Sequence, residues 1–133
     1  MIVDTSALVA IFQREAEAVP FLEALSGAQS TSISTVTFVE TATVLSYRKA
    51  KPMQATIEDF LDRLGVERVS FTDQHRIEAL DAHWRYGKGR HPAALNFGDC
   101  ISYATAKLAG ESLLYKGRDF SRTDIEPAFV EPG

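Results

Sequence analysis

Three carboxylates in this chain stand alone in long uncharged stretches. Each is the only Asp, Glu, Lys or Arg of its stretch: Asp4 in residues 1–13, Glu40 in residues 24–47 and Asp99 in residues 92–106. An isolated carboxylate among apolar residues is costly unless it is paired, hydrogen-bonded or bound to a metal. Since no Lys or Arg lies near any of the three in sequence, a divalent cation is the leading candidate for compensating their charge.

The chemistry of such a site follows from its ligands. Two carboxylates ~4 Å apart repel by ~4 kcal/mol at an effective dielectric of ~20, so a cluster of them needs a cation to stay ionised. Oxygen-only ligands suit Mg²⁺ or Mn²⁺, and a water on such an ion can attack a phosphodiester. Asp119 in Lys116–Phe120 is a candidate fourth acid, and Asp124 is the alternative to it.

Each acid also has a simpler structural interpretation. Asp4 precedes a predicted helix and could cap it, but Thr5 and Ser6 follow as better-placed caps and leave Asp4 free. Glu40 lies in a helix that we expect to be apolar nearly all round and buried. For Asp99, a capping role at the start of its helix fits the sequence as well as a catalytic one.

Short apolar strands alternate with amphipathic helices along the chain, which predicts an α/β domain with a mainly parallel central sheet. The expected strands are residues 1–3, 30–34, 66–71 and 112–115, with a last β-like piece at 125–130. The expected helices are residues 5–12, 15–25, 36–48, 53–64, 72–84 and 98–109, with loops at 86–92 and 116–122. Chemistry in such folds lies beyond the carboxyl ends of the strands, where Asp4 and Asp119 belong, whereas Glu40 and Asp99 must reach that edge from helices.

Composition limits the class of protein. With 133 residues, 45% hydrophobic and 24% charged, the chain fits a single domain, residues 1–133, with its own core. Cys100 is the only cysteine, which excludes an intrachain disulfide and a zinc site built from several thiolates. No signal sequence or membrane span is evident, so we expect a cytoplasmic protein. The net charge of −4 argues against wrapping nucleic acid over the whole surface, while a local basic rim stays open.

Five segments together resemble the PIN-domain family, and specifically VapC-type toxin ribonucleases. They are Ile2–Leu8, Phe38–Ala42, Tyr86–His91, Asn96–Cys100 and Leu113–Phe120. The resemblance implies a three-layer α/β/α fold with a central, mainly parallel sheet. It also implies a Mg²⁺- or Mn²⁺-dependent endoribonuclease, a VapB-type antitoxin as partner, and a homodimer.

The resemblance assigns roles to individual residues. Asp4, Glu40, Asp99 and Asp119 fall on the acidic constellation of the family, as catalytic residues and metal ligands, and Ser6 and Asn96 support the metal shell. The basic residues of two loops are candidates for holding RNA phosphates, with solvated surface charge as the alternative: Lys88, Arg90, Lys116 and Arg118.

Two other classes of function remain open from the residues alone. Receiver domains and aspartate-nucleophile phosphatases also pair Asp with Mg²⁺, but a phosphatase requires a second Asp where this chain has Ser6, and Asp4 lacks the neighbouring acid of a receiver. The second class is a metal-free binding module, whose acids only cap helices or bind a basic partner.

Overall fold

A four-stranded parallel sheet forms the centre of the molecule. The computed structural model describes residues 1–131, and its strands are β1 (Ile2–Val3), β2 (Ser32–Ser34), β3 (Glu67–Val69) and β4 (Leu113–Leu114). They lie in the order β3-β2-β1-β4, and every pairing is parallel. The last β-like piece that we expected is reduced to a single bridge between Pro127 and Leu113.

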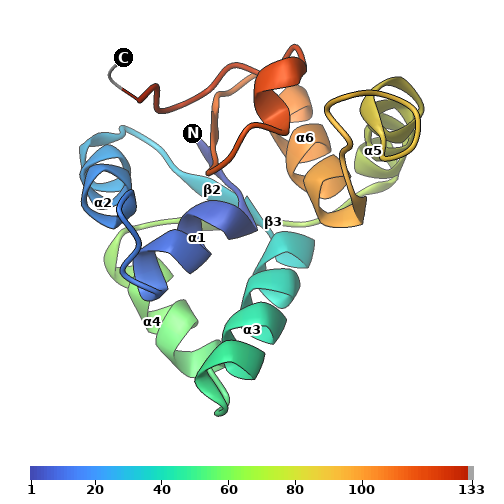
Figure 1. Cartoon of the computed structure of the whole chain (residues 1–133). Helices are drawn as coiled ribbons and strands as arrows, with labels where there is room; N and C mark the ends of the chain where they lie inside the picture. Colours follow the sequence, from blue (N-terminus) through green and yellow to red (C-terminus); the bar gives the residue numbers. More distant parts are fainter. Residues whose placement is uncertain (132–133) are drawn as a thin grey trace.

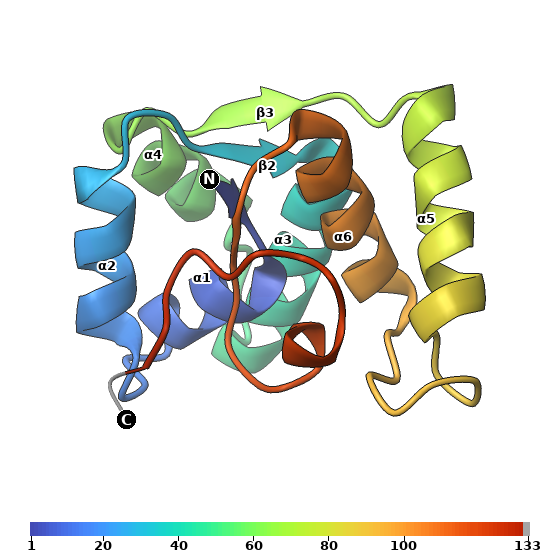
Figure 2. The same cartoon turned by 90° about the horizontal axis from the view of Figure 1, so that it is seen from above.

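Helices cover both faces of this sheet, as Figures 1 and 2 show. They are α1 (Thr5–Phe12), α2 (Ala18–Gly27), α3 (Thr35–Lys49), α4 (Gln54–Arg63), α5 (Asp73–Tyr86) and α6 (Phe97–Ala109), followed by the short 3-10 helix η1 (Phe120–Arg122). Val3 packs with α1 to α4 in one apolar core, and its neighbour Ile2 packs with α5 and α6 in a second. Because successive strand side chains point to opposite faces, β1 separates the two cores, which confirms the three-layer α/β/α prediction.

Local signals in the sequence begin and end the helices that carry the acids. Ser34 caps α3 through its Oγ, which accepts the Val36 N–H at 3.2 Å. Gly110 ends α6 with a positive φ of 65°, a conformation that costs glycine little. The parallel strands all point the same way, so the β1–α1 and β2–α3 junctions and the loop after β4 meet at one edge of the sheet.

Most expected elements lie within two residues of their predicted positions, but α2 begins at Ala18 rather than near Glu15. Residues 15–17 form a turn, with the Ala18 N–H donating to the Glu15 carbonyl at 3.0 Å. Within residues 1–131, no helix is both long and apolar enough to cross a bilayer. The predicted end of the domain, Gly133, lies outside the described residues.

Candidate active site

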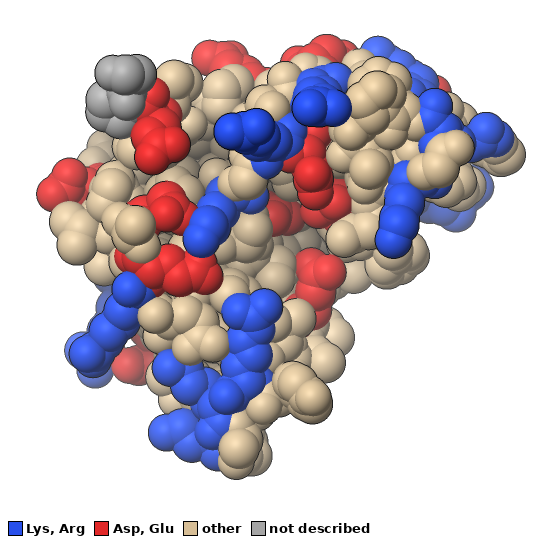
Figure 3. Space-filling model, viewed as in Figure 1, with Lys and Arg blue, Asp and Glu red and all other residues tan. Residues whose placement is uncertain are grey.

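An open cleft of about 440 Å³ lies at the carboxyl edge of the sheet, and the three solitary acids line it. Asp4 comes from the end of β1, Glu40 from α3 and Asp99 from the first turn of α6. Figure 3 shows acidic side chains around the hollowed middle of this face, with Lys and Arg side chains along its rim. Segments far apart in sequence therefore bring their carboxylates to one cavity, as the sequence predicted.

Hydroxyl groups hold Asp4, which is only 3% exposed. Its Oδ2 accepts the Ser6 N–H at 3.0 Å and the Ser6 hydroxyl at 2.6 Å, while its Oδ1 accepts the Ser102 hydroxyl at 2.5 Å. The Ser6 oxygen in turn accepts the Lys116 backbone N–H at 2.9 Å. Asp4 is the N-cap of α1, so the expectation that Thr5 or Ser6 would cap this helix was wrong. A carboxylate placed just before the first turn can accept the Ser6 N–H directly.

Glu40 lies on the side of α3 that faces α1 and the start of α6. Its Oε1 accepts the Thr5 hydroxyl at 2.5 Å, and Thr5 accepts the Thr41 hydroxyl at 3.1 Å. The opposite wall is Gly98, where an added Cβ would lie 2.0 Å from Glu40 Oε2. Burial, and secondarily the charge of Asp4, raises the pKa of Glu40 even though the Thr5 hydrogen bond lowers it.

The prediction that α3 is apolar nearly all round and buried was wrong. Its buried residues are Thr37, Thr41 and Leu45, and Val39 is 63% exposed. Glu40 is half-buried. The apolar composition of this helix misled the sequence analysis because α3 packs on the molecule along one side only.

Asp99 both caps its helix and faces the cleft. Its Oδ2 accepts the Asn96 N–H at 3.0 Å, and the Asn96 side chain accepts the Asp99 N–H at 2.9 Å, which is a reciprocal capping box. The pKa of Asp99 is raised to about 7, mainly because the carboxyl group is buried. The charges of Asp4, Asp119 and Glu40 raise it further, while the hydrogen bond from the Asn96 N–H lowers it. The two interpretations that the sequence left open for Asp99 are therefore compatible.

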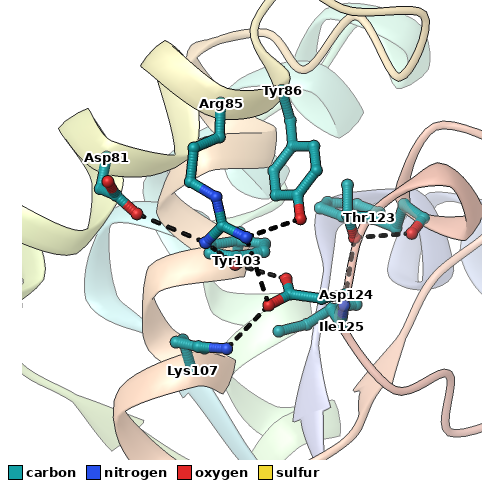
Figure 4. Close-up of polar contacts among 9 residues, drawn as sticks. Asp81, Arg85, Tyr86, Tyr103, Lys107, Thr123, Asp124 and Ile125 are labelled. Carbon is teal, nitrogen blue, oxygen red and sulfur yellow. Dashed lines mark hydrogen bonds and ion pairs between the residues drawn. The ribbon is translucent and has the colours of Figure 1, made fainter.

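The alternative fourth acids, Asp119 and Asp124, have different surroundings. Asp119 is exposed at the start of η1, and its charge contributes to the raised pKa of Asp99. Asp124 is engaged elsewhere, where its carboxylate accepts the Tyr103 hydroxyl at 2.5 Å and the Lys107 ammonium at 2.9 Å (Figure 4). Partial burial raises the pKa of Asp124, but these two hydrogen bonds and the charges of Lys107 and Arg85 outweigh it and bring the pKa to about 2. Neither acid lines the cleft, and of the two it is Asp119 whose charge reaches Asp99.

The four basic residues proposed for RNA do not share one surface. Lys116 lines the acidic cleft, and its Nζ lies 2.6 Å from Glu15 Oε2 and 3.0 Å from Glu17 Oε2. Arg118 lines a neighbouring cavity. Lys88 and Arg90 lie outside both cavities: Lys88 lines a groove between α5 and α6, and the Arg90 guanidinium stacks 3.9 Å from the centre of the Trp84 ring.

Sequence reasoning missed several residues of the site, which are Thr5, Glu15, Arg48 and Ser102. Ser102 is the clearest case, because its hydroxyl holds the buried oxygen of Asp4. Its signal in the sequence is its spacing, because a residue three positions after Asp99 lies on the same side of the helix.

The donor set fits a hard divalent cation. Among residues 1–131, no Lys or Arg forms an ion pair with Asp4, Glu40 or Asp99. The pKa of Glu40 and that of Asp99 are both raised, so the fold places carboxyl groups where their negative charge lacks compensation. In the same described range, no three Asp, Glu, His or Cys side chains are grouped tightly enough to hold an ion without adjustment. The carboxylates thus line one cleft but would have to move to bind one ion together.

Comparison with known proteins defines the class of the molecule. The PIN domain family model matches residues 1–126, and the chain belongs to this family. More particularly, the chain is 46% identical over 127 residues to Ribonuclease VapC36 of Mycobacterium tuberculosis, covering 95% of this chain and 91% of that protein. It is 42% identical over 125 residues to Ribonuclease VapC of Mycolicibacterium smegmatis, with 94% and 97% covered.

Solved structures of similar proteins share the fold. The crystal structure of Mycobacterium tuberculosis VapC20, described as a Sarcin-Ricin loop cleaving toxin, matches with a TM-score of 0.74 at 21% identity, over 98% of both chains. A toxin-antitoxin complex from Klebsiella pneumoniae matches with a TM-score of 0.70 at 22% identity, over 99% of this chain and 97% of the other. At these identities the likeness supports the PIN-like architecture.

Proposed function

We propose that this protein is a metal-dependent endoribonuclease that hydrolyses RNA phosphodiester bonds, as the toxin of a VapBC-type pair. The observation that carries the proposal is the convergence of Asp4, Glu40 and Asp99 on one cleft, where none of the three forms an ion pair with a Lys or Arg of the described residues. The relatives named as VapC ribonucleases cover almost the whole chain and support the same chemistry. Because the PIN family model matches residues 1–126, the receiver and phosphatase alternatives are dropped.

The chain's own residues divide the work in the cleft. Asp4, hydrogen-bonded by Ser6 and Ser102, and Asp99, hydrogen-bonded by Asn96, would be the main ligands of Mg²⁺ or Mn²⁺ after the adjustment described above. Such an ion supplies positive charge for the phosphate and lowers the pKa of a water. Glu40 has one oxygen engaged by Thr5, which leaves Oε2 to complete the metal shell or to accept a proton. Asp119 lies outside the cleft lining and adds its negative charge to the field at Asp99.

The same proposal extends to partners and location. The substrate is single-stranded RNA or an unpaired loop, since bases there are accessible. We propose a VapB-type antitoxin as the neutralising partner, a homodimer as the assembly, the cytoplasm as the compartment and residues 1–133 as one domain.

Metal-dependent cleavage of RNA tests the function. We expect purified protein to cut RNA with Mg²⁺ or Mn²⁺ and not with EDTA. Asp4→Ala and Asp99→Ala should abolish cutting while circular dichroism shows a folded domain. Asp59→Asn is a control at an exposed carboxylate on α4, paired with Arg63, and should cut normally. Full activity in both Ala variants would contradict the proposal.

The capping roles of Asp4 and Asp99 favour one alternative, a metal-free module in which both acids are structural. Asp99→Asn separates the two because asparagine keeps an oxygen that can accept the Asn96 N–H and removes the charge. Under the nuclease proposal, this variant is folded and inactive. Under the alternative, it behaves like the unmodified protein in every assay.

A further inference from the structure

A second cavity opens beside the acidic cleft. It has a volume of about 450 Å³ and shares Lys116 and Gly117 with the cleft, so the two cavities are direct neighbours. Its volume falls within the range of ~300–1,000 Å³ usual for ligand pockets. Nothing in the chemistry described above uses it.

Aromatic side chains form much of the wall of this side cavity, and charged residues of both signs line it: Lys116, Arg118, Glu17 and Glu131. Phe129 lines it and is fixed by an edge-to-face contact with Phe21, with ring centres 5.5 Å apart. Tyr115 lines it at the end of β4 and packs against Phe120 at 5.1 Å. Arg118 is exposed at the cavity and forms no ion pair within residues 1–131.

Lys116 forms the boundary between the two cavities. Its ammonium lies between Glu15 and Glu17, and the hydrogen bond that it donates to Glu15 is the main reason that the pKa of Lys116 is raised. Its backbone N–H donates to Ser6, which in turn holds Asp4. The boundary is therefore anchored on both sides, and the position of the side cavity is fixed relative to the candidate metal ligands.

We propose that the side cavity binds the base of the nucleotide next to the scissile phosphate. This inference rests on the proposed nuclease function. A phosphate held through a cation at Asp4 and Asp99 would have its next nucleotide within reach of the side cavity, because the cleft and the cavity meet at Lys116 and Gly117. Single-stranded RNA is commonly held by stacking its bases on aromatic side chains and by pairing its phosphates with arginine. Phe129 and Tyr115 supply the first, and Arg118 the second.

A substitution at Phe129 tests the assignment, and the chain provides a matched control. Phe129→Leu keeps an apolar side chain but removes the ring. Phe60→Leu does the same to a half-buried phenylalanine that makes an edge-to-face contact with Phe12 at 5.1 Å and lines neither cavity. Cleavage of a random-sequence RNA pool in Mn²⁺, with the cut ends sequenced, gives both the rate and the base preference at each position.

We expect Phe129→Leu to lower kcat/KM by about 5-fold or more, because losing a stacked base costs about 5- to 150-fold in affinity. The base preference at one nucleotide beside the cut should flatten, and Phe60→Leu should leave the preference unchanged. Arg118→Gln, at an exposed position that leaves the fold intact, should reduce the slope of log affinity against log salt by about one.

Each other outcome overturns the inference. If the Phe129→Leu variant cuts with the rate and base profile of Phe60→Leu, and Arg118→Gln leaves the salt slope unchanged, the cavity binds no nucleotide. If Phe129→Leu weakens binding of an antitoxin and leaves RNA cleavage as it was, the cavity is a protein-binding site instead. If the unmodified protein cuts no RNA at all, the proposed function is wrong, and this inference, which depends on it, is wrong as well.

Discussion

Replacing Gly98 by alanine should separate the chemistry of the cleft from the stability of the fold. Gly98 lies in the first turn of α6, directly against the Glu40 carboxylate. An alanine Cβ there would lie 2.0 Å from Oε2, whereas ordinary contact begins at 3.4 Å, so the oxygen must retreat by about 3.4 − 2.0 = 1.4 Å. A misplacement of ~1 Å in a catalytic group can cost ~10²-fold in rate, and we expect a loss of that order in kcat.

The stability of the same variant should change little. Alanine is favoured over glycine by up to ~1 kcal/mol within a helix, and losing the Thr5 hydrogen bond to Glu40 costs ~1 kcal/mol, so the net change should stay within ~1 kcal/mol. The Glu40 side chain can swing away because it is only half-buried. Gly27→Ala is the matched control, since that glycine also lies in a helix and its added Cβ meets nothing within 4 Å.

Thermal unfolding and initial rates of RNA cleavage measure both quantities. We expect a midpoint within a few degrees of the unmodified protein for both glycine variants, and a large loss of cleavage for Gly98→Ala alone. Normal cleavage by Gly98→Ala would refute the assignment of Glu40 to the site. A large drop in its midpoint would refute the view that this contact serves function rather than folding.

Three further predictions concern charge. Mn²⁺ at a hundredfold excess over its dissociation constant should stabilise the unmodified protein by ~2.7 kcal/mol and Asp99→Asn much less, measured as a shift in thermal midpoint. Without metal, the raised pKa of Asp99 means that this group contributes most to the free energy of unfolding below its ordinary pKa of 3.8, and that the contribution is lost as the pH rises to about 7. Denaturant titrations at several pH values should show that Asp99→Asn removes this pH dependence. Asp124, whose pKa is lowered to about 2, should stabilise the fold above pH 3.8 and lose that contribution as the pH falls towards 2, so Asp124→Asn should lower the midpoint at neutral pH and still cut RNA.

The position of the cleft was predictable from the sequence because its main signal is local. Asp4 follows a buried strand, and the parallel pairing of β1 with β2 and β4 brings the strand ends to one edge. Glu40 and Asp99 stand out because their surroundings lack charge. These features require only the alternation of strands and helices, which the sequence displays.

The partners of the acids were not predictable, because they depend on tertiary contacts. Ser102 meets Asp4 across 98 positions of the chain, and no local pattern links the two. The positions of the basic residues relative to the cleft were likewise not predictable from the sequence. Lys88 and Arg90 share a glycine-containing loop whose composition suits RNA, yet the fold places Arg90 on Trp84, outside the acidic cleft.

The most direct test of the central claim is an anomalous difference map from crystals soaked in Mn²⁺. The claim is that the solitary acids from β1, α3 and α6 act together as ligands for one site. We predict a strong peak in the cleft at about 2 Å from oxygens of Asp4 and Asp99, with Glu40 bound directly or through a water. A cleft without a peak at saturating Mn²⁺, while the protein still cuts RNA, would contradict the account.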